Sequence, residues 1–483
     1  MNVREEIEAL VEFEGRGPGS DAERRAAEHL VERLRAMGRE AETETVDTWP
    51  NWALTYAVHA FLVIVGSVVS VIVPVIGALL VLVVVVLTFL DAIGMAFTTR
   101  KLLGRRSSQN VISREDNDKG GDLYLVAHYD AGRGGLAYHP KLQERRAAFG
   151  KLVRRGIGPM EPFFWAMLAV LVCVLVRLTG IDNMLLTVFQ FIFTVLLIIS
   201  LPLLLDTAFA SPVPGANDNA SGVATVMRLA DRFGGELEHF NLNLLMTGSQ
   251  EGGSLGMRSY LKRRKGDLEP ARTVFLNVDE VGRGTVRFSS REGLLLPIES
   301  HNQLVDVCEQ MVEAKEQERE EEEANDEEGP DENGGRERDE DRAAAGDQER
   351  DEDRDDEPDE NRDEERDGDR NDDRDDERDE ERDEGRDDER DEDRPGVRSM
   401  TWRTSTDGYA ARSASFPAIS ITCKARLDYT PGHHQRTDTD DRVDDEALER
   451  AYAFIAELVG RIDETVGPDL AKPAEETLLK EES

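Results

Sequence analysis

Two long apolar stretches interrupt an otherwise strongly charged chain of 483 residues. Residues 52–97 are almost unbroken Ala, Val, Leu, Ile, Phe and Gly, which is more than the roughly 20 residues that one spanning helix needs. A turn near Val73 and Pro74 would divide this stretch into two helices. Residues 161–179 and 184–208 form a second pair around a short polar turn. Because these stretches lack polar alternation, they predict four inserted transmembrane helices rather than a buried soluble core.

The charged flanks of these helices predict their orientation. Arginine and lysine follow the first pair and precede the second, whereas the turns inside each pair carry almost none. The positive-inside tendency therefore places the flanks in the cytoplasm and both turns outside. An even number of spans in each pair also returns the chain to the side that it left. We expect a multi-pass protein of the cell membrane, in contact with the lipid bilayer, whose other parts meet in one cytoplasmic domain.

Outside the apolar stretches, short β-branched runs alternate with helical patterns. The runs are residues 123–127, 242–246, 273–278 and 418–423, and the helical patterns include 220–233 and 444–461. This alternation predicts an α/β domain with a mixed, mainly parallel sheet that helices cover on both faces. We assign to the domain residues 1–50, 105–140, 209–312 and 395–465. The helix pairs at 52–97 and 161–208, an acidic insert at 313–394 and a tail at 466–483 lie outside it.

The acidic insert and the overall charge limit the setting of the protein. Residues 313–394 are nearly all Glu, Asp and Arg without an apolar face, which predicts a disordered, extended segment. A long charged helix is the alternative for its Glu-rich start at 313–324. The formal net charge of −41 suits a cytoplasm of high salt, where screening shortens repulsion to ~3 Å at about 1 M. Nucleic-acid partners are excluded because they need a positive face. Three scattered cysteines predict no disulfide framework and a reducing compartment.

Five side chains of metal-ligand type lie at the ends of strand-like runs or in Gly-rich turns. They are His128 in LVAHYD, Asp218 in GANDNASG, Glu251 in TGSQEGG, Asp279 in LNVDEVG and His434 in GHHQRTDT. Such positions hold a carboxylate or an imidazole rigidly above the edge of a sheet. Each one alone is more often a capping or hydrogen-bonded residue. Together they match the needs of two divalent cations, which are one shared ligand and roughly two more ligands each.

This ordered set resembles the co-catalytic di-zinc aminopeptidases of metallopeptidase family 28. The family motifs are read here in His128-Tyr129-Asp130, in the turn from Gly215 to Gly222, in Gln250-Glu251 before Gly253 and Gly256, in Asn277-Val278-Asp279, and in His434 before Asp438-Thr439. The segments GRGPGSDAERRAAEHLVERLRAMG and TDGYAARSASFPAISI are similar to the family as well. The likeness covers residues 1–50, 105–135, 208–310 and 398–465. It implies a membrane-embedded, haloarchaeal-type member with the three-layer α/β/α fold of zinc exopeptidases, which is phosphorylase/hydrolase-like.

The resemblance also implies a role for each matched residue. His128 and Asp279 would hold one zinc ion, Glu251 and His434 would hold the other, and Asp218 would bridge the two. The carboxylate of Asp130 would accept the second ring N–H of His128 and so fix its tautomer. The metals would activate a shared water, and the free α-amino group of a peptide substrate would bind beside them. A strained peptide bond is implied between Asp218 and Asn219, and His433 stands where it could donate to an oxyanion.

One position departs from the family pattern. Gln250 occupies the place of the general base, which is the first Glu of the family's Glu-Glu pair. A neutral amide cannot accept a proton, and general base catalysis contributes about 10²–10⁴-fold. Three alternatives stay open: a slow or inactive relative that binds zinc and peptides, a substitute carboxylate such as Glu280, or Glu251 acting as the base. We expect a membrane-bound, zinc-dependent aminopeptidase-like hydrolase, with a weak or inactive peptide-binding scaffold as the alternative. The sequence leaves the oligomeric state undetermined.

Overall fold

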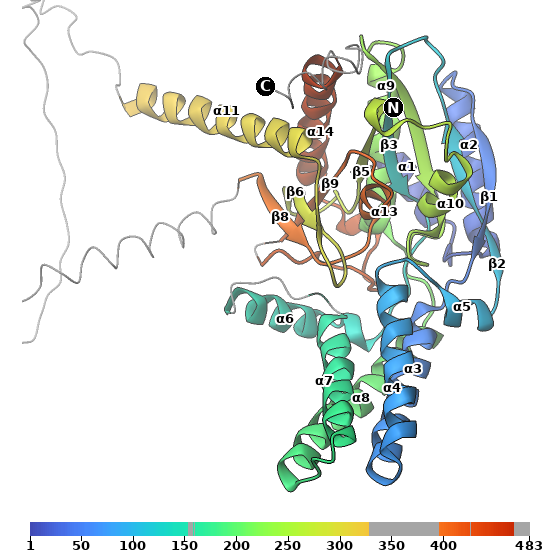
Figure 1. Cartoon of the computed structure of the whole chain (residues 1–483). Coiled ribbons are helices and arrows are strands. Elements are labelled where there is room, and N and C mark those ends of the chain that lie inside the picture. Colours follow the sequence, from blue (N-terminus) through green and yellow to red (C-terminus); the bar gives the residue numbers. More distant parts are fainter. Residues whose placement is uncertain (153–157, 159, 328–395, 426, 468–483) are drawn as a thin grey trace, which may run out of the picture. The chain divides into compact units, whose positions relative to one another are not determined.

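The computed structural model describes residues 1–152, 158, 160–327, 396–425 and 427–467 (Figure 1). Its described residues up to 314 and from 396 onward form one compact unit, and residues 315–327 belong to a second unit. A mixed sheet organises the first unit. Its strands follow the order β1 (Glu42–Thr48), β2 (Arg106–Ser113), β4 (Phe240–Thr247), β3 (Gly121–His128), β5 (Thr273–Val278), β9 (Ala418–Lys424), β6 (Thr285–Glu292) and β7 (Ile298–Glu299), with β8 (Arg398–Trp402) beside β6.

The four central strands are parallel, as the sequence predicts. In this register Leu125 of β3 lies opposite Leu244 of β4 and Leu276 of β5. The sheet is mixed, as predicted, but antiparallel pairs on its flanks are as frequent as parallel pairs: β1–β2, β2–β4, β6–β7 and β6–β9 are antiparallel, and β6–β8 is parallel. The physical reason on one side is the first apolar helix pair. The chain leaves β1, passes through this pair and the short helix α5 (Thr98–Leu102), and returns as β2, so the insertion joins the two strands as a long hairpin connection would.

Helices cover the sheet on both faces and make three layers. One core contains Leu123, Leu125 and Ala127 of β3. On that face lie α1 (Val3–Val11), α2 (Asp21–Ala36), α9 (Ser221–Phe233) and α14 (Asp445–Thr465). The alternate residues Tyr124 and Val126 face a second core, under α10 (Leu255–Arg263) and α13 (Asp407–Ser413). Because both faces are covered, the central strands are buried at nearly every position.

Four helices are long and apolar enough to cross a membrane, as predicted from composition. They are α3 (Trp52–Ile72), α4 (Pro74–Ala92), α7 (Glu161–Leu178) and α8 (Met184–Phe209). The chain reverses between α3 and α4 at the predicted position near Val73 and Pro74. Pro74 is the first residue of α4, where a helix does not use the backbone N–H that proline lacks. The four helices pack around a separate apolar cluster that contains Val63, Val81 and Met167. Many of their other side chains, such as Ile72 and Phe191, are exposed and apolar.

Three further α-helices lie in the described residues. The helix α5 (Thr98–Leu102) follows α4, α6 (Pro140–Leu152) lies between β3 and α7, and the long helix α11 (Asn302–Glu327) follows β7. The prediction of a disordered segment over residues 313–394 is wrong for residues 313–327, because these form the Glu-rich end of α11. A long charged helix was the alternative prediction for residues 313–324. Glutamate has a good intrinsic helix propensity, which outweighs the missing apolar face. The rest of the predicted insert, to residue 394, and most of the tail lie outside the described residues.

Candidate metal centre

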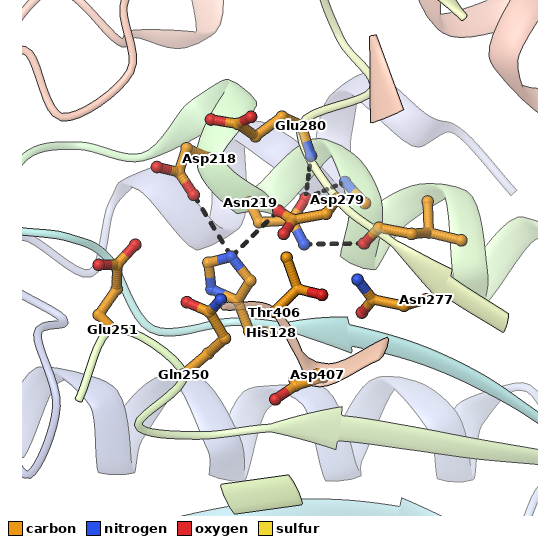
Figure 2. A network of polar contacts seen from close by, with 12 residues as sticks. His128, Asp218, Asn219, Gln250, Glu251, Asn277, Asp279, Glu280, Thr406 and Asp407 are labelled. Carbon is orange, nitrogen blue, oxygen red and sulfur yellow. Dashed lines mark hydrogen bonds and ion pairs between the residues drawn. The ribbon is translucent and has the colours of Figure 1, made fainter. Parts of the chain in front are cut away.

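His128 and Asp279 come from neighbouring parallel strands. His128 is the last residue of β3, and Asp279 directly follows β5. The carboxyl ends of parallel strands meet at one edge of a sheet, so the two side chains converge there. Nε2 of His128 lies 3.2 Å from Oδ1 of Asp279, and both residues are buried (Figure 2).

Asp218 lies in the irregular turn η2 (Ala216–Ala220) that opens α9. The peptide bond between Asp218 and Asn219 is cis. The carboxylate of Asp438 accepts the backbone N–H groups of Asn217 and Asp218, at 2.9 and 3.1 Å. The Asn219 side chain donates to the carbonyl of Val278 and thereby ties the turn to the end of β5. Asp218 is therefore held from two sides before any ligand binds.

The two oxygens of Asp218 face two different histidines. Oδ1 lies 3.3 Å from Nε2 of His128, and Oδ2 lies 3.4 Å from Nε2 of His434. On the far side, Nε2 of His434 lies 2.9 Å from Oε1 of Glu251. The structure thus brings all five sequence-predicted residues into one group, with Asp218 between the His128–Asp279 and the Glu251–His434 pairs.

Asp130 differs from its predicted role in one respect. Nδ1 of His128 donates to the backbone carbonyl of Asp130 at 3.0 Å, whereas the nearest carboxylate oxygen lies 3.6 Å away. That carboxylate instead accepts the backbone N–H groups of Gln250 and Glu251, each at 3.0 Å. Asp130 therefore still fixes the His128 ring, but through its carbonyl. Its carboxylate orients the loop that carries Glu251.

The donor set fits zinc. Ligand atoms about 2.0–2.1 Å from a tetrahedral zinc lie roughly 3.3 Å from one another. The contacts of 2.9–3.4 Å among the five residues match this spacing. The charge fits as well: burial lowers the pKa of His128, but Asp279 and Asp218 raise it well above its ordinary value. The group therefore attracts positive charge, which a proton or a metal can supply.

Glu280 and His433 form a second polar group beside Asp218. Nδ1 of His433 lies 2.5 Å from Oε1 of Glu280 and 3.0 Å from Oδ2 of Asp218. The other oxygen of Glu280 accepts from Nζ of Lys424 and from Oγ1 of Thr430. Burial would raise the pKa of Glu280, but Lys424 and His433 lower it to about 2. Glu280 is therefore a weak proton acceptor, and the Nδ1 of His433 is already engaged.

Gln250 lies next to His128 and Glu251 (Figure 2). Its Nε2 donates to the carbonyl of Ser405 at 3.3 Å. Sequence reasoning missed Asp407, which is buried nearby at the start of α13 and accepts a hydrogen bond from Thr247. Burial and the neighbouring carboxylates of Asp130 and Asp279 raise the pKa of Asp407 to about 7. The sequence offered one indication of this residue, since Thr406 and Asp407 begin the family-like segment TDGYAARSASFPAISI.

Comparisons with known proteins add a partial family match. Residues 205–334 match the profile of Peptidase family M28. The matched range includes Asp218, Glu251 and Asp279, whereas His128 and His434 lie outside it. Similar solved structures include a Zn-dependent exopeptidase from Parabacteroides distasonis (11% identity, 95% of this chain and 96% of that chain, TM-score 0.43) and the zinc aminopeptidase BSAP from Bacillus subtilis (11%, 95% and 93%, 0.44). A glutaminyl cyclase from Bacteroides thetaiotaomicron is also similar (11%, 95% and 96%, 0.45). No curated protein sequence matches the chain.

Proposed function

We propose that this chain is a membrane-bound, zinc-dependent hydrolase of the aminopeptidase type. The observation that carries the proposal is the position of Asp218 between two histidines, each of which has its own carboxylate partner. His128 and Asp279 would hold one zinc ion, Glu251 and His434 the other, and Asp218 both. Zinc bound there would lower the pKa of a water toward about 7 and polarise a scissile carbonyl.

The chain's own residues prepare this site for a peptide. Asp130 and Asp438 fix the backbones that carry Glu251 and Asp218, so the ligand side chains lose little freedom on binding. Glu280 holds His433 against Asp218. A protonated α-amino group is the substrate feature that such a concentration of carboxylates binds, and this favours removal of residues from the N-terminus of a peptide.

Gln250 supports a second candidate function, a peptide-binding relative with weak or no turnover. Its amide cannot accept the proton that a hydrolytic water must lose. Glu280 is a poor substitute because Lys424, Thr430 and His433 engage its carboxylate. Glu251 is the other carboxylate that could replace the missing general base. It contacts His434, so a role as base would compete with its role as a ligand.

The four apolar helices support placement in a membrane. Their exposed side chains are apolar, and basic residues such as Arg105 and Arg145 flank the pairs. We place these flanks and the sheet-containing unit on the cytoplasmic side, with the turns inside each helix pair outside. Peptides of the cytoplasm would then be the substrates.

A single comparison tests both functions. The wild-type protein and Gln250→Glu are purified in detergent and high salt, bound zinc is counted by mass spectrometry, and hydrolysis of amino-acid anilides is followed with and without a chelator. We expect two zinc ions in both proteins and a rate that rises about 10²–10⁴-fold in Gln250→Glu. Chelation should abolish the activity.

The other outcomes separate the alternatives. A silent wild-type protein with an active variant supports the peptide-binding function. Equal activity in both proteins assigns the base to another group, of which Glu251 is the first to test. His128→Ala is the negative control, because it removes a proposed ligand. Absence of bound zinc from the folded wild-type protein would contradict the proposal.

A further inference from the structure

The loop that carries Glu251 is also held from the first apolar helix pair. Nη1 of Arg100, in α5 just after that pair, donates to the carbonyl of Gly252 at 2.5 Å. Gly252 is the neighbour of Glu251 in sequence. The guanidinium is buried, with 5% of the residue exposed, so this bond does not compete with solvent.

The same guanidinium is fixed on its other side by the end of α4. Nε of Arg100 donates to both oxygens of Asp91, at 3.0 and 2.9 Å, and Nη2 donates to Oδ1 at 2.6 Å. Tyr56 of α3 donates its hydroxyl to the same Oδ1 at 2.8 Å. A fork of this kind sets the orientation of arginine in a way that lysine cannot reproduce. Both apolar helices of the first pair therefore determine where Arg100 points.

The loop itself needs this external support. Ser249 and Ser254, which begin and end it, adopt left-handed conformations with φ of 56° and 54°. Non-glycine residues hold such conformations only where the surroundings impose them. Asp130 binds the loop from the side of the sheet, and Arg258 donates to the Gly253 carbonyl at 3.3 Å. Within the described part of the chain, Arg100 provides the hydrogen bond that reaches the loop from the side of the apolar helices.

Among the described residues, no hydrogen bond joins α3, α4 or α5 directly to His128 or Asp279. His128 and Asp279 extend from β3 and β5, at the centre of the sheet. A displacement of α3 and α4 would therefore act on Glu251 and leave the His128–Asp279 pair in place. The two halves of the proposed metal site differ in what holds them.

We propose that Arg100 is a positioning residue for Glu251, and that Asp91 and Tyr56 make the first apolar helix pair a working part of the metal centre. This inference rests on the proposed function, since it assigns Glu251 and His434 to one zinc ion. Its consequence is that the zinc ion held by Glu251 and His434 depends on the state of the first apolar helix pair. The zinc ion held by His128 and Asp279 does not.

The test compares Arg100→Ala, Arg100→Lys and Asp91→Asn with the full-length wild-type protein in detergent. Two variants serve as controls: Arg105→Ala removes an exposed guanidinium paired with Asp47, and Thr88→Val removes a hydroxyl that contacts His59 inside the same helix pair. Zinc affinity is measured by competition with a chelator, and amide exchange is measured over residues 249–255. Anilide hydrolysis gives kcat and KM.

We expect Arg100→Ala and Asp91→Asn to weaken one of the two zinc sites about 10–100-fold and leave the other unchanged. Exchange over 249–255 should become faster, and kcat should fall more than KM rises. Arg100→Lys should recover part of each effect, because an ammonium can still donate to Gly252. Both controls should behave like the wild-type protein.

Two results would overturn the inference: equal weakening of both zinc sites, or zinc affinities and exchange that match the controls. If Arg100→Ala does not fold, Arg100→Lys and Asp91→Asn decide by the same measurements. If the wild-type protein binds no zinc, the proposed function fails, and the exchange data alone decide whether Arg100 positions the loop. The two failures are therefore distinguishable.

Discussion

Asp407 shows how the side chains of the proposed metal centre shape the energetics of a single residue. It is fully buried, and burial together with Asp130 and Asp279 raises its pKa from an ordinary 3.8 to about 7. Between these two values the folded protein retains a proton that the unfolded chain releases. Because the folded state then binds more protons, stability falls as the pH rises through this window. Above pH about 7 the buried carboxylate of Asp407 is charged in the folded protein, and the full loss of stability is present.

Asp407→Asn should therefore stabilise the metal-free protein at pH 8 and have little effect near pH 4. The difference between 3.8 and about 7 is roughly three pKa units, or at most about 4 kcal/mol at about 1.36 kcal/mol for each unit. Urea unfolding of both proteins in detergent with a chelator, at several pH values, measures it. Asp441→Asn, at an exposed position, is the control. A difference that does not grow between pH 4 and pH 7 would contradict the assigned pKa.

At this scale, the sequence predicts which residues converge but not how each is used. His128 ends β3 and Asp279 follows β5, and parallel strands end at one edge of a sheet, so their meeting is a consequence of topology. The role of Asp130 depends on whether its carbonyl or its carboxylate faces His128, which the conformation of the loop decides. Asp407 and Arg100 reach the site through contacts between segments 152 or more residues apart, and no local pattern marks those contacts.

At the scale of elements, close packing of α3 against α4 depends on two glycines. A Cβ atom built at Gly77 would lie 2.5 Å from backbone atoms of Ser70, and one at Gly66 would lie 2.7 Å from the side chain of Val81. Helix pairs in lipid pack through such small residues, because lipid offers no hydrophobic force that would hold larger ones together. The two glycines therefore set the distance between the helices of the first pair.

Gly77→Val should push α3 and α4 apart and destabilise the protein. Overpacking of this kind typically costs about 1–3 kcal/mol, and we expect a lower midpoint of thermal unfolding in detergent. Since Asp91 lies on α4 and contacts Arg100, faster amide exchange over 249–255 should accompany the loss. Leu79→Ala is the control, because Leu79 lies on the same helix with 61% of its surface exposed. A variant as stable as the wild-type protein would show that the helices do not need this contact.

The elements also show where pattern suffices and where connectivity decides. Residues 273–278, read as a strand, form β5 with the same bounds, and Pro74 marks the start of α4. Parallel pairing holds for β4, β3, β5 and β9 and for the pair β6–β8. The antiparallel flank at β1 and β2 follows from an insertion of two helices that returns the chain beside its point of departure. Alternation of strands and helices cannot reveal such a return.

For the whole molecule, charge asymmetry carries the prediction of orientation. The formal net charge is −41, yet the segments that follow the first helix pair and precede the second are rich in arginine and lysine. Acidic residues contribute little to orientation, whereas arginine and lysine close to the ends of the spans decide it. The large negative charge therefore does not oppose a cytoplasmic position of the sheet-containing unit. It also favours solubility at high salt, where screening is strong.

Orientation is testable with single cysteines in a background without Cys173, Cys308 and Cys423. Asp182→Cys lies in the exposed turn between α7 and α8, and Asp441→Cys lies on the sheet-containing unit. A maleimide that does not cross membranes should label Asp182→Cys in intact cells and Asp441→Cys only after lysis. The reverse pattern would place the metal centre outside the cell. Its substrates would then be extracellular peptides, and the basic flanks would lie on the side that the positive-inside tendency disfavours.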